Sequence, residues 1–323
     1  MTCNSRVSVA MATYNGAQYL REQLDSLASQ TRLPDELVVT DDGSTDSTLE
    51  VLADFAKSAP FPVRIERNPN NLGYAKNFEK AARLCTGDIV FFCDQDDIWH
   101  AQKIETVVAR FKESCRALTV LNDARLVDET GRWSGKTQYG SIRKVGLGDR
   151  LFVTGCCSAH RRAWLELILP IPDGMAHDLW VSRAAHELGG ASIIDRPLQD
   201  FRRHGANSSD WLISRPDQGA GVALQFHMQS GLKPADAGWR FEQEMLRDMK
   251  ARLEKAPSGL LSSLGLEKGP SALDRNIATF QRRIDLCARP RRKRIFPVLQ
   301  LLAHGGYGQF SGWKSALKDL VRP

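Results

Sequence analysis

An apolar run that ends in a cluster of acids is the feature that most limits how this chain can fold. Residues 89–92 (IVFF) are typical of a buried strand, and Asp94, Asp96 and Asp97 follow directly. Unpaired carboxylates are too costly to bury, so these acids must meet solvent, a cation or a cationic partner. Asp94 and Asp96 point the same way if the extended geometry continues. Two such oxygen donors suit Mg²⁺ or Mn²⁺ bridging to a diphosphate, although a solvated acidic turn is the alternative for this motif alone.

Segments typical of strands and of helices alternate through the first hundred residues. Strands are expected where short apolar runs end in turn residues, at 7–12, 36–40, 62–65 and 89–92. Between them apolar side chains recur at helical spacing, as at Leu20 and Leu24. This alternation predicts an α/β fold with a mostly parallel sheet flanked by helices. The polar turns that follow the strands should converge at one edge of the sheet, where open α/β sheets bind ligands: 13–16, 41–46 and 94–97.

Four motifs, in this order, resemble those of a known enzyme family. They are TYNG at 13–16, DDGSTD at 41–46, NLG at 71–73 and DQDDIW at 94–99. Together they resemble the family 2 glycosyltransferases, which have the Rossmann-like GT-A fold. The particular residues of the last motif resemble those of the rhamnosyltransferase-like branch, which builds bacterial surface polysaccharides such as O-antigen. The resemblance is dense over 5–105, recurs at 154–210, is faint across 211–290 and partly returns in the tail.

The resemblance implies a nucleotide-binding role for eight residues: Thr13, Tyr14, Asn15, Asp41, Asp42, Lys76, Asp94 and Gln95. Thr13 and Tyr14 would flank the base. Asp42 would accept a hydrogen bond from the pyrimidine, while Asp41 would either support the turn or touch the base. Lys76 would reach a phosphate or the donor.

The resemblance also implies a site for Mg²⁺ or Mn²⁺. Asp96 is the direct ligand, and Asp94 holds the ribose or a metal-bound water. Residues 201–207 (FRRHGAN) resemble the family's YRxHGxN segment, with Phe in place of the usual Tyr. His204 would be the remaining metal or diphosphate contact, and Arg202 or Arg203 would balance phosphate charge.

The acceptor side is implied by the small residues at 154–160 and by the helix that opens near residue 177. Asp178 matches the family's general base, which takes a proton from the acceptor hydroxyl as it attacks the anomeric carbon. A helix N-cap is the alternative for Asp178, and helix capping is likewise the alternative for Asp97. Contacts to the acceptor or donor sugar are assigned to Trp99, His177, Trp180, Cys156 and Arg203. Packing as half-buried aromatic residues is the alternative for both Tyr14 and Trp99.

The resemblance and the composition together suggest a catalytic domain at 1–220, with a nucleotide-binding half (1–105) and an acceptor half (106–220). A helical extension would follow at 221–323, with helices at 240–254 and 271–286. The stretch 207–221 is rich in Ser, Asp, Gly and Pro, and would either close over the donor or serve as a plain connector.

The seven cysteines show no paired metal-ligand spacing, which favours reduced thiols and a cytoplasmic location. No apolar run approaches the ~20 residues that a spanning helix needs. The cationic run 289–294 (RPRRKR) precedes the apolar run 295–302, which suits peripheral contact with the inner face of the cytoplasmic membrane. A docked helix with a solvated basic edge is the alternative. No groove-reading motif accompanies the net charge of +6, so nucleic acid is not expected as a partner.

The sequence therefore predicts a metal-dependent, inverting glycosyltransferase. Its expected donor is dTDP-L-rhamnose, with a UDP-hexose second, and its acceptor a saccharide or a polyprenyl-diphosphate-linked saccharide. A nucleotidyltransferase would need a glycine-rich, basic phosphate loop after the first strand, and Ala12 to Asn15 offer none. A non-catalytic nucleotide-sugar binding protein is the remaining alternative.

Overall fold

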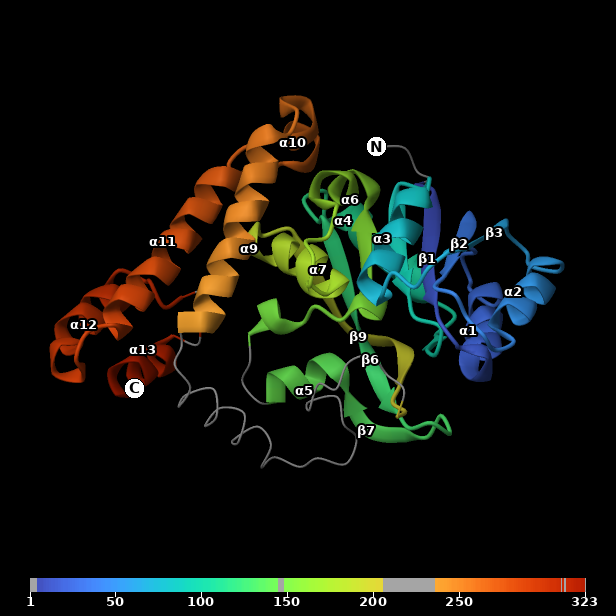
Figure 1. Cartoon of the computed structure of the whole chain (residues 1–323), viewed down its shortest axis with the longest axis horizontal. Helices are drawn as coiled ribbons and strands as arrows, with labels where there is room; N and C mark the ends of the chain where they lie inside the picture. Colours follow the sequence, from blue (N-terminus) through green and yellow to red (C-terminus); the bar gives the residue numbers. More distant parts are fainter. Residues whose placement is uncertain (1–4, 145–147, 206–235, 309, 311, 323) are drawn as a thin grey trace. The chain divides into compact units, whose positions relative to one another are not determined.

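A computed structural model describes residues 5–144, 148–205, 236–308, 310 and 312–322 (Figure 1). The chain divides into two compact units, Met1–Ser141 with Phe152–Asp217, and Ile142–Leu151 with Gln218–Pro323. The predicted boundary at residue 220 and the predicted donor-covering stretch 207–221 lie outside the described residues.

Nine strands of the first unit form one sheet, in the order β3-β2-β1-β4-β8-β6-β9-β5, with β7 paired to β6. Their bounds are β1 Val7–Thr13, β2 Glu36–Asp41, β3 Val63–Arg67, β4 Ile89–Cys93, β5 Ile98–Trp99, β6 Thr119–Val127, β7 Trp133–Thr137, β8 Ser158–Arg161 and β9 Ala191–Arg202. Strands β1 to β4 are parallel, as predicted for the first hundred residues. The sheet as a whole is mixed, because β8 runs antiparallel to both β4 and β6.

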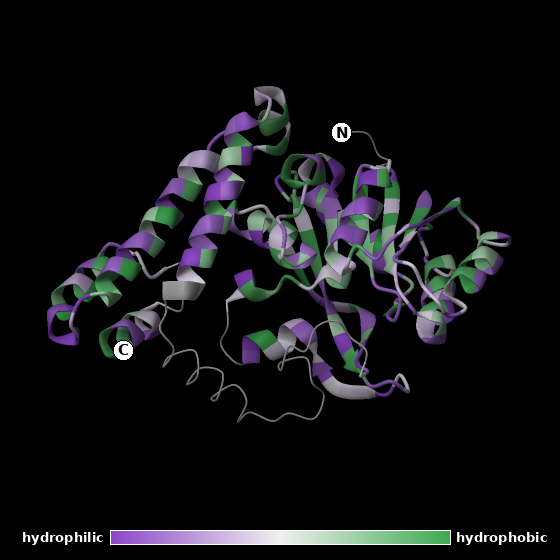
Figure 2. Cartoon of the chain, in the orientation of Figure 1, coloured by the Kyte–Doolittle hydropathy of each residue, from purple (hydrophilic) through white to green (hydrophobic). Residues whose placement is uncertain are grey.

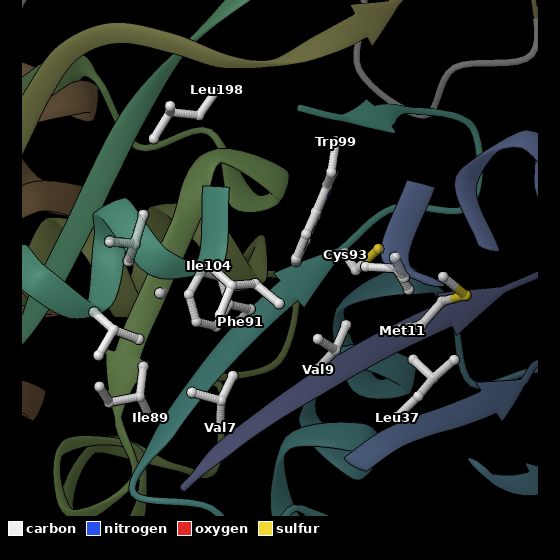
Figure 3. Close-up of a cluster of buried hydrophobic side chains, with 14 of the residues drawn as sticks. Val7, Val9, Met11, Leu37, Ile89, Phe91, Cys93, Trp99, Ile104 and Leu198 are labelled. Atoms are coloured by element: carbon white, nitrogen blue, oxygen red, sulfur yellow. The ribbon is translucent and has the colours of Figure 1, made fainter. Parts of the chain in front are cut away.

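Helices cover both faces of the parallel part of the sheet. They are α1 Ala17–Ala28, α2 Thr48–Ala56, α3 Tyr74–Leu84, α4 Lys103–Glu113, α6 Arg162–Ile168 and α7 His177–Glu187, and α5 Gln138–Lys144 follows β7. Side chains alternate along each strand, so Val9 and Phe91 join a core with Leu24 of α1 and Ile104 of α4 (Figure 3). On the opposite face Phe92 packs on Phe78 of α3, and α3 also contacts α6 and α7.

The register of the parallel strands brings their polar ends together. Thr13 at the end of β1 lies beside Asp41 at the end of β2, and Met11 lies beside Cys93 at the end of β4. The turns that follow these strands therefore share one edge of the sheet, as predicted.

The second unit is helical, with α9 Asp236–Lys255, α10 Ser258–Leu264, α11 Gly269–Cys287, α12 Ile295–Ala303 and α13 Trp313–Val321. Helices α9 and α11, which contain the two predicted helices, pack along each other. A buried ion pair joins Arg283 of α11 to Asp319 of α13, at 2.8 and 2.9 Å, and the Tyr307 hydroxyl also donates to Asp319. Among the described residues, no helix has the length and apolar character needed to cross a membrane.

Candidate functional site

A hollow of about 480 Å³ opens at the carboxyl ends of β1, β2 and β3. It is lined by Tyr14, Asp42, Gly43, Arg67, Asn68, Pro69, Asn70 and Asn71. The Tyr14 ring is 50% exposed and is thus available to a flat ligand. Arg67, at the end of β3, also lines the hollow. The sequence reasoning did not identify it, because a charged residue at the end of a strand is usually expected to be solvated.

Asp42 fixes the loop that borders this hollow. Its Oδ1 accepts hydrogen bonds from the backbone N–H of Leu72 and the side-chain amide of Asn68, both at 2.8 Å. Its Oδ2 accepts from the backbone N–H of Gly73 at 2.9 Å. A carboxylate oxygen can accept more than one hydrogen bond, so Oδ2 retains capacity for a donor on a ligand.

Asp41 supports the turn, which resolves the alternative left open by the sequence. The carboxylate is fully buried and accepts from the Thr13 hydroxyl at 2.9 Å, and from the backbone and hydroxyl of Ser44 at 2.9 and 2.5 Å. Thr13 is itself buried, as Asp42 is, and that it flanks the base stays a prediction. Asp41 and Thr13 thus stabilise the turn at 41–46 through buried hydrogen bonds.

Gln95 joins the first and third turns. Its side-chain amide accepts from the backbone N–H of Tyr14 at 2.9 Å and donates to the Tyr14 carbonyl at 3.1 Å. A Cβ on Gly16 would lie 2.1 Å from Oε1 of Gln95, so this approach requires glycine. Asn15 has a positive φ of 47°, and its side-chain oxygen accepts from the backbone N–H of Thr45 in the second turn at 2.8 Å. Asn15 and Gln95 thus hold the three turns together, and neither side chain is left pointing freely into the hollow.

The structure brings two of the predicted metal ligands, Asp96 and His204, into contact. Nε2 of His204 lies 2.8 Å from Oδ2 of Asp96. The imidazole also packs on the Tyr19 ring, with 4.8 Å between ring centroids. An aromatic neighbour and a carboxylate together fix the orientation of this histidine.

Asp94 stands at the centre of a crowded acidic cluster. Burial, and then the negative charges of Asp96 and Asp178, raise the pKa of Asp94 to about 7. Ligand atoms of Asp94, Asp97 and Cys156 all lie within 4.8 Å of one another. Acids from the end of β4 and from the start of α7 therefore act on one another electrostatically.

This arrangement fits a divalent cation. Asp94 and Asp96 offer hard oxygen ligands, and an imidazole nitrogen of His204 lies 2.8 Å from Asp96. The ligand atoms that the structure brings within 4.8 Å of one another are those of Asp94, Asp97 and Cys156. Burial is the largest cause of the raised pKa of Asp94, and the charges of Asp96 and Asp178 add to it; a bound Mg²⁺ or Mn²⁺ would offset those charges.

Asp97 has a structural role that the sequence reasoning did not foresee. Its carboxylate accepts from the Gln199 amide at 2.8 Å and from the backbone N–H of Arg202 at 3.2 Å, which ties β9 to the acidic turn. The capping alternative is wrong, because α4 begins at Lys103 with Gln102 as its N-cap.

Lys103 is a fully buried cation close to the acidic cluster, and the sequence reasoning did not identify it. Its Nζ donates to the Cys156 carbonyl at 2.8 Å and to the side-chain oxygen of Gln199, and lies 3.8 Å from the centroid of the Trp99 ring. Burial lowers its pKa, and nearby Asp97 opposes that shift. The sequence did contain one indication that Lys103 has an anionic partner. Lys103 is the first residue of α4, and a lysine in the first turn of a helix is electrostatically disfavoured unless a nearby anion compensates its charge.

Three residues predicted to touch a sugar are instead buried. Trp99 packs on Phe91, at 5.6 Å between ring centroids, and its backbone N–H donates to the Ser26 hydroxyl. Trp180 is fully buried and its indole N–H donates to the Ile168 carbonyl at 2.8 Å. Cys156 lies beneath the acids, and burial raises the pKa of its thiol. The sequence could not separate these residues from surface ones, since large aromatics and small polar residues occur in both places.

His177 also belongs to the packing, contrary to the predicted sugar contact. Its ring stacks on Phe78 at 4.2 Å, and its Nε2 would lie 2.4 Å from a Cβ on Gly155. Burial lowers its pKa, so the ring is held neutral.

Asp178 occupies a different position from its neighbour His177. It is only partly buried in the first turn of α7, whose N-cap is Ala176, so the N-cap alternative for Asp178 is wrong. Its charge raises the pKa of both Tyr74 and Asp94. The carboxylate therefore faces the acidic cluster electrostatically while keeping contact with solvent.

The predicted phosphate-binding cations are differently placed. Lys76 donates to the Ile171 carbonyl at 2.5 Å and lies 3.2 Å from Asp173, so it is engaged away from the predicted role. Arg202 is buried, donates to the carbonyls of Asp96 and Glu129, and so braces the acidic turn. Arg203 is more exposed, with its guanidinium 5.6 Å from the centroid of the Phe201 ring.

Comparisons with known proteins agree with this architecture. The family model described as Glycosyl transferase family 2 matches residues 8–169, just over half of the chain. An uncharacterized glycosyltransferase from Nostoc sp. is 29% identical over 63% of this chain, and an uncharacterized protein of Mycobacterium tuberculosis is 33% identical over 61%. The chain spans 66% and 59% of the lengths of these two relatives.

Solved structures share the fold at low sequence identity. Staphylococcus aureus TarS 1–349, in complex with UDP, has a TM-score of 0.52 and 18% identity, covering 98% of this chain and 89% of that one. The mannosyltransferase PcManGT of Pyrobaculum calidifontis, in complex with GDP-Man and Mn²⁺, has a TM-score of 0.51 and 21% identity, covering 99% and 86%. The predicted GT-A fold is thereby confirmed.

Proposed function

Since the chain belongs to glycosyl transferase family 2, we propose that it moves a sugar from a nucleoside-diphosphate donor to an acceptor hydroxyl by a metal-dependent, inverting displacement. One observation carries the proposal. His204 meets Asp96, Asp94 lies close to Asp97 and Cys156 at the same edge of the sheet, and Asp178 acts on Asp94 from another element. A carboxylate set apart from the ligand cluster, yet near it, is the arrangement that a single displacement requires.

In this proposal each side chain has a defined task. The base of the donor lies against Tyr14 in the hollow, with Asp42 accepting a hydrogen bond. Asp178 takes the proton from the acceptor hydroxyl as the oxygen attacks the anomeric carbon. Asp178 suits this task because it is partly exposed, whereas the adjacent His177 is buried and kept neutral.

The cation site would consist of Asp94, Asp96 and His204. When bound, Mg²⁺ or Mn²⁺ neutralises charge on the departing nucleoside diphosphate. The protein keeps these ligands in place through Arg202, which bonds the backbone of Asp96, and through Asp97, which bonds the backbone of Arg202.

For the donor we propose dTDP-L-rhamnose. A protein of Shigella flexneri named dTDP-rhamnosyl transferase RfbG is 38% identical over 102 residues, which cover 30% of this chain and 35% of that protein. A UDP-hexose is the competing donor, because both nucleotides present a pyrimidine to Tyr14 and Asp42.

Calorimetric titration of the full chain with dTDP and with UDP, each with and without Mn²⁺, tests the proposal. We expect Mn²⁺-dependent binding, tighter for dTDP, and release of dTDP from dTDP-rhamnose when acceptor saccharides are added. Tighter binding of UDP would replace the rhamnosyl proposal with the hexosyl one. Binding of neither nucleotide would contradict the transferase proposal itself.

We further propose that the acceptor is a saccharide, free or linked to a polyprenyl diphosphate, and that the enzyme works peripherally at the inner face of the cytoplasmic membrane. The support for this location is the cationic run 289–294 beside the apolar run 295–302.

A further inference from the structure

Two short helices of the second unit present apolar side chains to solvent. On α12 these are Ile295, Phe296 and Leu299, and on α13 they are Trp313, Leu317 and Val321, and together we call them the apolar face. Phe296 is 75% exposed and Trp313 is 64% exposed. Figure 2 shows hydrophobic residues along both helices. Aromatic side chains this exposed are unusual on a surface that meets only water.

Both helices carry apolar side chains on more than one side, so some remain exposed when one side packs. The opposite sides of the two helices meet in a small core that contains Val298, Leu301 and Ala316. On α13 the exposed residues recur every fourth position, from Trp313 to Val321, which makes one continuous stripe. Each helix thus exposes apolar side chains in addition to those that hold the unit together.

Positive charge is concentrated beside this face. Residues 289–323 hold eight Lys or Arg and one acid, a net charge of +7, while the whole chain has +6. Residues 1–288 are therefore close to neutral, at −1. The one acid, Asp319, is buried in its ion pair with Arg283. Four of the cations are exposed just before or at the turn that leads into α12, and we call them the basic turn: Arg289, Arg291, Arg292 and Lys293.

We propose that the apolar face and the basic turn form an interfacial site for an anionic lipid bilayer. The helices lie in the plane of the interface, with Phe296 and Trp313 among the acyl chains and the basic turn among the phosphates. Tryptophan is enriched at this depth of a membrane. A second copy of the chain fits less well, because residues 289–323 carry a net charge of +7 and two such segments would repel each other. The inference deepens the peripheral location proposed above and identifies the residues responsible.

Co-sedimentation of the full chain with vesicles tests the proposal without donor or acceptor. We expect binding to phosphatidylcholine vesicles that contain phosphatidylglycerol, weaker binding to phosphatidylcholine alone, and loss of binding as salt rises. Replacing Arg291, Arg292 and Lys293 with Gln should weaken binding on the order of 100-fold, at about fivefold per cation. Phe296→Gln should weaken it by about tenfold or more.

Matched controls come from exposed residues of the first unit, Leu33→Gln and Arg116→Gln, which should bind as the unchanged chain does. Vesicles should also shift the tryptophan emission, and Trp313→Phe should remove that shift while binding persists. Equal binding to neutral and anionic vesicles, or no effect of Phe296→Gln, would overturn the proposal. So would self-association of the free chain that Phe296→Gln abolishes. Nucleotide titration of the same variants separates a failure of the membrane proposal from a failure of the transferase proposal. The affinity for the donor nucleotide should be the same in all of these variants.

Discussion

Nε2 of His204 lies 2.8 Å from a carboxylate oxygen of Asp96, although 108 residues separate them in the chain. The contact joins the end of β9 to the end of β4. The proposed cation site therefore draws on two segments that are far apart in the sequence.

Replacing Asp96 with Asn should abolish transfer and weaken Mn²⁺-dependent nucleotide binding, because an amide is a poorer ligand for a hard cation. Calorimetry with dTDP, with and without Mn²⁺, measures both effects. Asp54→Asn, at an exposed carboxylate of the first unit, is the control and should change neither. Unchanged Mn²⁺ dependence in Asp96→Asn would remove Asp96 from the metal site.

Replacing Asp178 with Asn should separate chemistry from binding. A base acts on the acceptor, so donor affinity should stay nearly intact while the transfer rate falls by on the order of 10²–10⁴. Asp173→Asn, at an exposed acid on the loop before α7, is the matched control. Transfer at close to the normal rate in Asp178→Asn would refute the base assignment.

Gly16→Ala should weaken nucleotide binding by about tenfold, through loss of the two hydrogen bonds between Gln95 and Tyr14. The added Cβ would occupy the position of the Gln95 amide. Gln95→Ala should show a similar loss, and the double variant should be no worse than either single one. Gly259→Ala, where the Cβ meets no other group within 4 Å, is the control. Additive losses would mean that Gly16 acts independently of Gln95.

The buried, neutral His160 should make the fold sensitive to acid. Burial lowers the pKa of His160 to about 3, against 6.5 for a free histidine. Between these values the unfolded chain binds a proton that the folded chain does not, so stability falls as pH drops below 6.5. The free energy of unfolding, measured with urea, should therefore depend less steeply on pH in His160→Gln. The slope should fall by up to about 1.4 kcal/mol per pH unit. His304→Gln, at an exposed histidine, should keep the original slope, and an unchanged slope in His160→Gln would contradict the assignment.

Lys103→Met should lower the free energy of unfolding by about 3 kcal/mol, because it leaves the Cys156 carbonyl and the Gln199 side chain without their buried donor. Urea denaturation measures the change. Lys57→Met, at an exposed lysine, should have little effect. A stability equal to that of the unchanged chain would mean that the buried amine is dispensable.

The sequence predicted the parallel strands and the acidic turn because both depend on local patterns. Apolar runs that end in turn residues define β1, β2 and β4 without knowledge of the rest of the fold. The polar ends of parallel strands then have to meet. Asp94 and Asp96 were proposed from this reasoning, and His204 from its resemblance to a family motif.

The sequence did not separate the residues that touch a ligand from those that hold the site in place. Trp99, Trp180 and His177 stand beside site residues in the chain, but each is buried by elements distant in sequence. Burial of this kind depends on tertiary packing, which no local pattern records. Lys103 was missed for the same reason, since its partners Cys156 and Gln199 lie far along the chain.

The position of His204 at the end of β9 has a consequence for the order in which the protein acquires its chemistry during synthesis. Strand β9 pairs with β6 through two register shifts and with β5 in the antiparallel direction, so its placement needs both strands. The turns that form the nucleotide hollow are translated by residue 97, about a hundred residues before the histidine. A prematurely terminated chain would therefore contain the residues that line the hollow while lacking His204, the residue proposed to complete the cation site.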